Sequence, residues 1–230
     1  MKLSLVVPCY NEEEVLPRTA PMFLDKINQL AGEGKISDDS RVLFINDGSK
    51  DKTYQKLKQL YNNYHNESNI QVLTFSRNFG KEAAMYAGLS KAVGDLVCII
   101  DADLQQRPEV VIEMLDVLNS DEELDCVAAY QQSRKESAVL SAFKSAFYKL
   151  INKISDVDFV NGASDFRLMK RAMVDAILQM SEFHRFSKGI FSYVGFNTEY
   201  IPYQVEKRES GETKWSFRKL FRYALDGIFG

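Results

Sequence analysis

The chain of 230 residues has few of the cysteines and histidines that build disulfide frameworks and metal clusters, and its apolar runs are short. It has three cysteines, far apart and without Cys-x-x-Cys spacing, and two histidines. A disulfide scaffold and a multi-histidine metal site are therefore excluded, and a reducing compartment fits best. The uncharged apolar runs are far shorter than the about 20 residues of a membrane-spanning helix. Lysine and arginine (29) do not outnumber aspartate and glutamate (32), so nucleic acid is not an expected partner.

Apolar residues make up 45% of the chain, which is enough for a buried core. In the first half, short runs rich in Val, Ile, Leu and Phe alternate with segments of helical periodicity. The strand-like runs are 3–7, 41–45, 70–75, 95–100 and 125–129, and the helical segments are 13–30, 52–64, 81–92 and 108–118. Strands that are apolar throughout are buried on both faces. This pattern predicts an α/β fold, a mostly parallel central sheet with helices on both faces.

The second half of the chain is less regular. The sequence predicts an amphipathic helix over 137–154, a short strand over 166–169 that leads into a helix over 171–180, and a further strand over 197–203. No repeat, low-complexity stretch or linker separates these segments from the first half. We therefore expect one domain with a C-terminal appendage.

Polar clusters follow the first four predicted strands, at the point where each strand ends. They occupy residues 8–12, 46–49, 76–81 and 101–105. Each could be an ordinary turn, since Asn, Asp, Gly and Ser are common turn residues. In a parallel sheet, however, ligands bind outside the carboxyl ends of the strands. Four polar clusters at one edge predict a single binding cleft there.

Asp101 and Asp103 follow the apolar run 95–100 and are separated by one residue. Two carboxylates this close disfavour each other's charged form unless a cation or hydrogen-bond donors lie nearby. Mg²⁺ commonly binds one or two carboxylates together with water and phosphate oxygens, and Gln105 adds a carbonyl oxygen. Asp-x-Asp alone also fits a solvated turn. The other polar clusters at the same edge favour a cation site.

Four segments carry a resemblance to a known family: Val6-Val7-Pro8-Cys9-Tyr10-Asn11-Glu12-Glu13, Asn46-Asp47-Gly48-Ser49, Asp101-Ala102-Asp103-Leu104-Gln105 and Asp165-Phe166-Arg167-Leu168. In this order they resemble family 2 glycosyltransferases, and more narrowly the polyprenyl-phosphate type of bactoprenol glucosyltransferase and dolichyl-phosphate mannose synthase. The resemblance runs from Leu3 to the last residue. It implies a GT-A fold, a nucleotide-sugar donor, a divalent cation (Mg²⁺ or Mn²⁺) and a polyprenyl-phosphate acceptor.

The resemblance also implies residue roles. The nucleotide-binding residues would be Pro8, Tyr10, Glu12, Asp47, Lys81, Asp101 and Ala102, with Asp47 accepting a hydrogen bond from the base. Asp103 and Gln105 would bind the metal, and Asp165, Asp103 and Arg208 would be catalytic. Asp165 could orient a donor hydroxyl, position Arg134 or accept a proton. The sequence departs from the family pattern at one place, next to Asp103 and Gln105. Where many relatives carry Asp or His and then Pro before Pro-Glu, this chain has Gln106-Arg107-Pro108-Glu109.

The acceptor side resembles the family's Arg-x-x-Gly-x-[Ser/Thr]-Lys loop, present here as Arg208, Gly211, Thr213 and Lys214. Arginine suits a phosphate because its planar donors can bind two oxygens at once. The residues that would hold the acceptor phosphate are Arg134, Arg208, Ser210 and Lys214. A solvated, charged hairpin is the alternative interpretation of this loop.

Segment 215–229 has apolar residues at helical spacing and cations on the other side. This pattern fits a helix on a membrane surface and fits a core helix about equally well. The resemblance favours the membrane, because relatives continue from here into transmembrane helices while this chain stops at Gly230. We therefore expect a GT-A domain over 1–206, an acceptor loop and membrane-surface helix over 207–230, and a location at the cytoplasmic face of the membrane.

The predicted activity is metal-dependent, inverting transfer of a hexose to a polyprenyl phosphate. UDP-glucose is the favoured donor, with GDP-mannose, UDP-galactose and UDP-N-acetylglucosamine left open. One alternative is a family 2 transferase that uses a polysaccharide or another sugar acceptor. Another is a membrane subunit that binds a nucleotide sugar without catalysis. A homo-oligomer is compatible with the sequence.

Overall fold

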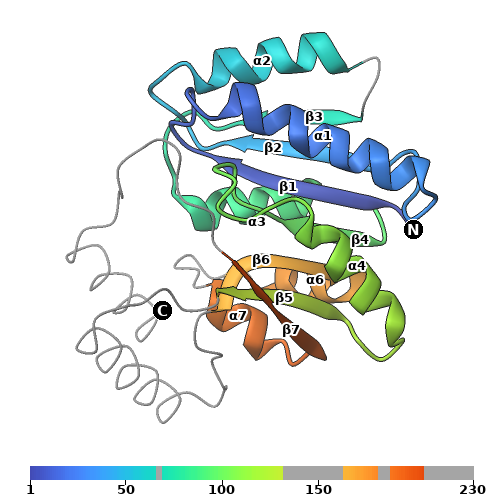
Figure 1. Ribbon diagram of the computed structural model, residues 1–230. Helices are drawn as coiled ribbons and strands as arrows, with labels where there is room; N and C mark the ends of the chain where they lie inside the picture. Colours follow the sequence, from blue (N-terminus) through green and yellow to red (C-terminus); the bar gives the residue numbers. More distant parts are fainter. Residues whose placement is uncertain (66–68, 132–162, 181–186, 205–230) are drawn as a thin grey trace.

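The computed structural model describes residues 1–65, 69–131, 163–180 and 187–204 (Figure 1). Seven strands form one sheet in the order β3-β2-β1-β4-β6-β5-β7. The strands are β1 (Leu3–Cys9), β2 (Arg41–Asn46), β3 (Ile70–Thr74), β4 (Leu96–Ile99), β5 (Cys126–Gln131), β6 (Ala163–Lys170) and β7 (Thr198–Tyr203). The helices are α1 (Leu16–Gly32), α2 (Thr53–Tyr64), α3 (Lys81–Lys91), α4 (Val110–Ser120), α6 (Arg171–Gln179) and α7 (Ser187–Tyr193).

Strand direction confirms the mostly parallel sheet predicted from the sequence. β1 pairs in parallel with β2 and β4, β2 pairs in parallel with β3, and β5 pairs in parallel with β7. Among the described strands, β6 alone runs the other way, antiparallel to both β4 and β5. The beginning of β6 therefore lies at the same edge of the sheet as the carboxyl ends of the other strands.

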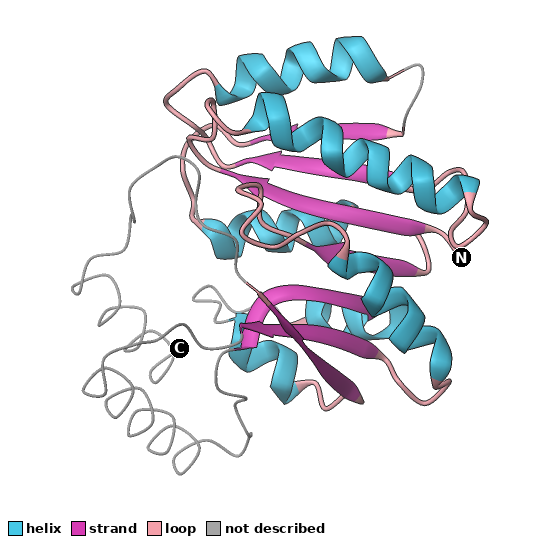
Figure 2. Ribbon diagram, viewed as in Figure 1, coloured by secondary structure: helices cyan, strands magenta, loops and turns pink. Residues whose placement is uncertain are grey.

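Helices cover both faces of the sheet, also as predicted (Figure 2). On one face, α1, α2 and α4 bury apolar side chains such as Phe23, Leu57 and Met114 against the strands. On the other face, α3, α6 and α7 do the same with Met85, Met173 and Phe191. Each strand places alternate residues on opposite faces, so strands that are apolar throughout serve both layers.

Several boundaries differ by one to three residues from the predicted ones; β6, for example, begins at Ala163 where the sequence predicted residue 166. β1 continues through Pro8 and Cys9, which the sequence pattern assigned to the following loop. Pro8 is tolerated because β1 pairs with β4 only as far as Val6 and beyond it with β2 alone. The first helix begins at Leu16, with a proline in its first turn where the missing N–H costs no helical hydrogen bond.

The predicted helices over 137–154 and 215–229 lie outside the described residues. In the part of the chain that the structure describes, no helix has both the length and the apolar character needed to cross a bilayer.

Candidate active site

Hydrogen bonds join the loops that follow β1 and β2. The backbone N–H of Asn11 donates to Ser49 Oγ at 3.0 Å, and Lys50 N–H donates to Asn11 Oδ1 at 2.9 Å. The N–H of Glu12 donates to Oγ1 of Thr53, the first residue of α2, at 2.8 Å. Asn11 has a positive φ of 54°, a conformation that Asn adopts more easily than most residues. These contacts hold Tyr10 and Glu12, both half-buried, beside the end of β2.

The loop after β3 is attached to the end of β2 in the same way. Phe75 N–H donates to Asn46 O at 2.9 Å. A Cβ on Gly48 would lie 2.1 Å from the carbonyl carbon of Arg77, and the φ of Gly48 is +57°, so this contact requires glycine. Asp47, buried at 2% exposure, directs its carboxylate at residues 78–80. The predicted convergence of the polar clusters at one edge is thus confirmed for these three loops.

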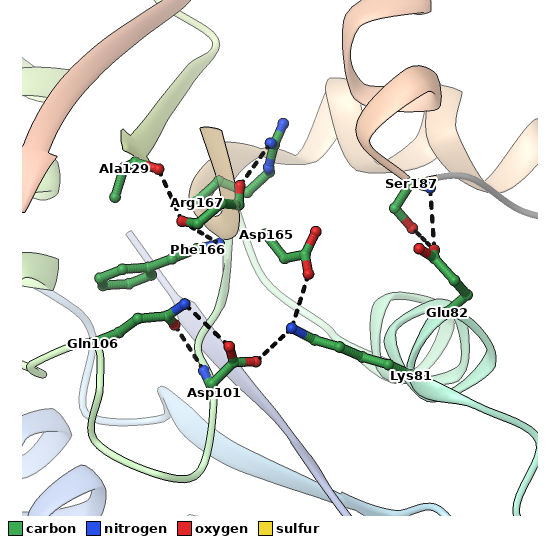
Figure 3. Close-up of polar contacts among 10 residues, drawn as sticks. Lys81, Glu82, Asp101, Gln106, Ala129, Asp165, Phe166, Arg167 and Ser187 are labelled. Atoms are coloured by element: carbon green, nitrogen blue, oxygen red, sulfur yellow. Dashed lines mark hydrogen bonds and ion pairs between the residues drawn. The ribbon is translucent and has the colours of Figure 1, made fainter. Parts of the chain in front are cut away.

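Lys81 joins two carboxylates that come from different strands (Figure 3). Its Nζ lies 2.7 Å from Asp101 Oδ1 and 2.8 Å from Asp165 Oδ2. Lys81 begins α3, Asp101 follows β4, and Asp165 lies near the start of β6. The antiparallel register pairs Ile99 with Arg167. Asp101 comes two residues after Ile99 and Asp165 two residues before Arg167, so the two aspartates lie at the same level. The reversed direction of β6 therefore brings Asp165 to this edge.

The ion pair controls the ionisation of Asp165. Burial raises the pKa of this carboxyl, but the charges of Lys81 and Lys188, the hydrogen bond from Lys81 and the charge of Arg167 outweigh the burial and lower the pKa to about 2. Burial lowers the pKa of Lys81, and the charges of Asp101 and Asp165 outweigh it and raise the pKa above its ordinary value. Both groups are therefore charged at neutral pH. The second carboxylate oxygen of Asp165, Oδ1, is buried and has no hydrogen-bond partner among the described residues.

Gln106 holds Asp101 in place. Its Oε1 accepts a hydrogen bond from Asp101 N–H at 2.9 Å, and its Nε2 donates to Asp101 Oδ2 at 3.1 Å. Gln106 is 4% exposed, whereas 32% of the Asp101 side chain is exposed, so the bonds run from a buried amide to a carboxylate at the edge of the site. The sequence marked Gln106 only as a departure from the family pattern and assigned it no role. Its carboxamide both donates and accepts, which a carboxylate in the same place would not do.

Asp103 and Gln105 lie in the turn between Asp101 and Gln106. Gln105 N–H donates to Asp103 Oδ1 at 3.1 Å, and Leu104 adopts a positive φ of 56° between them. Both side chains are half-buried. Within the described ranges, no group of three or more His, Cys, Asp or Glu residues could hold a metal by itself. Asp103 and Gln105 offer one carboxylate and one amide oxygen, and hard oxygen donors of this kind fit a divalent cation that completes its shell with phosphate oxygens and water.

Arg167 and Glu82 are two further polar side chains beside this cluster. Arg167, 3% exposed, stacks its guanidinium 3.6 Å from the centre of the Phe191 ring and donates to Ser164 O at 3.1 Å. Glu82 accepts hydrogen bonds from both the N–H and the hydroxyl of Ser187, the first residue of α7. Sequence reasoning did not find the link between Glu82 and Ser187, because no local pattern relates two helices far apart in the chain.

The structure therefore brings together the predicted residues Lys81, Asp101, Asp103, Gln105 and Asp165. Pro8, Tyr10 and Glu12 lie at the end of β1, and Ala102 is buried at 4% exposure as part of the hydrophobic core. The predicted acceptor residues Arg134, Arg208, Ser210 and Lys214 lie outside the described residues.

Comparison with known proteins agrees with this arrangement. Residues 4–178 match glycosyl transferase family 2. The prophage bactoprenol glucosyl transferase homolog of Escherichia coli is 40% identical over 230 residues, which cover 99% of this chain and 71% of that protein. Among solved structures, Mycobacterium tuberculosis glucosyl-3-phosphoglycerate synthase in complex with Mn²⁺, UDP and phosphoglyceric acid has a TM-score of 0.59 at 16% identity, covering 97% of this chain and 75% of its own.

A second solved structure, the mannosyltransferase PcManGT of Pyrobaculum calidifontis in complex with GDP-Man and Mn²⁺, has a TM-score of 0.58 at 17% identity. It covers 91% of this chain and 57% of its own. Identities this low establish the fold, whereas the family match and the 40% identical relative establish kinship. The chain belongs to glycosyltransferase family 2 and has the GT-A fold.

Proposed function

We propose that the protein transfers a hexose from a nucleotide diphosphate sugar to a polyprenyl phosphate, with inversion at the anomeric carbon. The observation that carries this proposal is the cluster of Lys81, Asp101 and Asp165 beside the Asp103 loop, at the edge where the polar loops meet. The name of the 40% identical E. coli relative, a bactoprenol glucosyl transferase homolog, supports the lipid acceptor. UDP-glucose is the donor we favour.

On the donor side, the loops after β1 and β2 would hold the nucleoside through Pro8, Tyr10 and Glu12. Asp103 and Gln105 would bind Mg²⁺ or Mn²⁺. The bound cation would offset the negative charge that develops on the departing diphosphate. Lys81, with 42% of its side chain exposed, would add a positive charge beside it. The amide and carboxylate of the 103–105 turn leave most of the coordination shell to phosphate and water.

On the acceptor side, a phosphate monoester is already an anionic nucleophile at neutral pH, because its second pKa is about 6. A strong general base is therefore not required. Asp165 suits this reaction, since a carboxyl with a pKa of about 2 holds no proton at neutral pH and is a weak base. Its proposed role is to hold Lys81 and to offer its buried Oδ1 to a donor hydroxyl. Arg134, Arg208, Ser210 and Lys214 would bind the acceptor phosphate, and Arg208 would act in the transfer step.

Segment 207–230 would supply the acceptor loop and a helix at the membrane surface. The polyprenyl chain keeps the acceptor in the bilayer, so the GT-A domain over 1–206 would work at the cytoplasmic face of the membrane. Cationic side chains on such a helix are attracted to anionic headgroups.

The test is release of nucleoside diphosphate from UDP-glucose, measured with and without Mg²⁺ or Mn²⁺ and with and without undecaprenyl phosphate. We expect release only when both cation and lipid phosphate are present, and NMR of the product to show the inverted anomer. Asp103→Ala should abolish release. Asp116→Ala, which removes an exposed carboxylate from α4 that pairs with Lys35 at 3.1 Å, should not change it.

Two outcomes would contradict this function. Release that depends on a soluble sugar acceptor and ignores lipid phosphate would favour the polysaccharide-type transferase. A rise in melting temperature with UDP-glucose and cation, but no release with any acceptor, would favour a binding subunit without catalysis.

A further inference from the structure

The carboxylate of Asp47 is occupied by the loop that precedes α3. Oδ1 accepts a hydrogen bond from Phe79 N–H at 2.7 Å. Oδ2 accepts one from Asn78 Nδ2 at 2.7 Å and another from Gly80 N–H at 2.9 Å. Asp47 is 2% exposed, so these three bonds are largely shielded from water. Hydrogen bonds to a buried carboxylate are among the stronger ones in proteins.

These bonds end at the residue immediately before Lys81. Gly80 has a φ of 98° and immediately precedes Lys81, the first residue of α3. The hydrogen bond that holds the Gly80 N–H therefore also fixes where the helix begins. Next to it, the backbone of Arg77 packs directly against Gly48, one residue after Asp47. The end of β2 and the 78–80 loop are therefore held together, and Lys81 follows directly from this loop toward Asp101 and Asp165.

We propose that Asp47 is a positioning residue for the transfer reaction: by holding residues 78–80 it sets the Nζ of Lys81 between Asp101 and Asp165. This inference rests on the proposed function for its kinetic consequence, but the contact that it describes exists without substrate. It differs from the role that the family resemblance implies, in which Asp47 reads the base of the nucleotide. A base contact would act on donor affinity, whereas positioning of Lys81 would act on the transfer step.

Asp47→Asn is the informative variant. A carboxamide of the same shape has a single acceptor oxygen, and its NH₂ would face the N–H of Gly80 and the amide of Asn78, which are both donors. The loop would then shift and carry Lys81 with it. Misplacement of a group by about 1 Å can cost about 10²-fold in rate. We expect kcat to fall by about 10²-fold and the KM for UDP-glucose to change by less than about threefold.

The coupling to Lys81 is measured in a double-mutant cycle with Lys81→Met. If Asp47 acts through Lys81, the double variant should be no slower than Lys81→Met alone. The matched control is Asp95→Asn, which removes a carboxylate acceptor of the backbone N–H of Lys2 (2.7 Å) at the opposite edge of the sheet. This control should leave kcat unchanged. Asn78→Ala deletes one of the three hydrogen bonds to the Asp47 carboxylate. It should lower kcat less than Asp47→Asn does and leave the KM for UDP-glucose nearly unchanged. This variant tests the proposal even if Asp47→Asn folds poorly.

A second measurement does not depend on any transfer activity. The pKa of Asp165, followed by carboxyl NMR in the free protein, should rise from about 2 toward its ordinary value in Asp47→Asn and in Lys81→Met alike. An unchanged pKa in Asp47→Asn overturns the proposal whatever the enzyme does. So does a raised donor KM with unchanged kcat, or additive effects in the cycle. A wild-type protein without transfer activity, but with the NMR shift, would count against the proposed function only.

Discussion

At the scale of single residues, Lys81 links two carboxylates of the site. Lys81 pairs with both Asp101 and Asp165, Gln106 holds Asp101 from the other side, and Asp47 holds the loop before Lys81. Motif matching alone could identify the carboxylates, since their spacing and the resemblance pointed to them. It could not identify which of them share a partner, because Lys81 and Asp165 come from distant parts of the chain.

The ion pair predicts a pH dependence of stability. The pKa of Asp165 is lower in the folded chain, at about 2, than the ordinary value of 3.8. The stabilisation is therefore complete above that ordinary value and is lost as the pH falls toward the folded value. In urea unfolding, Asp165→Asn should be less stable than the wild type at pH 7, and the difference should shrink steadily between about pH 4 and pH 2.

Asp175→Asn is the control for this titration. Asp175 also pairs with a cationic side chain, here Arg171 at 3.4 Å, but 55% of the Asp175 side chain is exposed. Exposed pairs contribute little, typically about 0–1 kcal/mol, so this variant should unfold like the wild type at every pH. A difference for Asp165→Asn that stays constant down to pH 2 would contradict the assigned ionisation.

At the scale of elements, helix α3 connects the core to the site. Its first two residues, Lys81 and Glu82, contact β6 and α7, and further along Gly88 lies against Val6 of β1. The close approach of α3 to β1 keeps the start of the helix beside the carboxyl ends of the strands. A glycine inside a helix lowers its intrinsic stability, and here it permits this approach.

Gly88→Ala tests that packing. The added Cβ would lie 2.3 Å from Val6 Cγ1, so the helix must move or the core must rearrange. We expect a loss of about 1–3 kcal/mol in the free energy of unfolding, as overpacking a core commonly produces. Val6→Ala in the same chain should restore part of the loss, measured by urea denaturation.

Gly32→Ala is the matched control, because Gly32 ends α1 and a Cβ there would meet nothing within 4 Å. This variant should keep or slightly raise stability, since alanine is the better helix former. Equal losses at both positions would show that helix propensity, and not the contact with Val6, determines the effect.

At the scale of the whole molecule, the sheet extends to Tyr203, and three of the four proposed acceptor residues, Arg208, Ser210 and Lys214, follow it. β7 pairs with β5 along its full length, and the ring of Tyr203 packs edge-on against Phe166 with centroids 6.1 Å apart. This contact ties the last described strand to β6, which carries Asp165. The division at residue 206 proposed from the sequence would thus leave the described sheet intact.

Truncation after Glu206 tests this division. We expect the shortened chain to melt cooperatively and to keep its thermal shift with UDP-glucose and cation, because the donor loops belong to the sheet. Transfer to undecaprenyl phosphate should be lost, since Arg208 and Lys214 are removed. Truncation before β7, after Phe196, should destabilise the fold by exposing β5 and Phe166. Undiminished lipid-dependent transfer by the 1–206 chain would contradict the acceptor role of segment 207–230.

The sequence by itself determined the elements, the layers and the chemistry of the loops. Apolar runs, helical periodicity and turn residues are local features, and they predicted strands β1 to β5, the helices between them and the polar edge. The antiparallel direction of β6, the bridge from Lys81 to Asp165 and the engagement of Asp47 by residues 78–80 were decided only by the tertiary structure. Such contacts depend on strand direction and register between distant segments, and a hydrophobic pattern encodes neither.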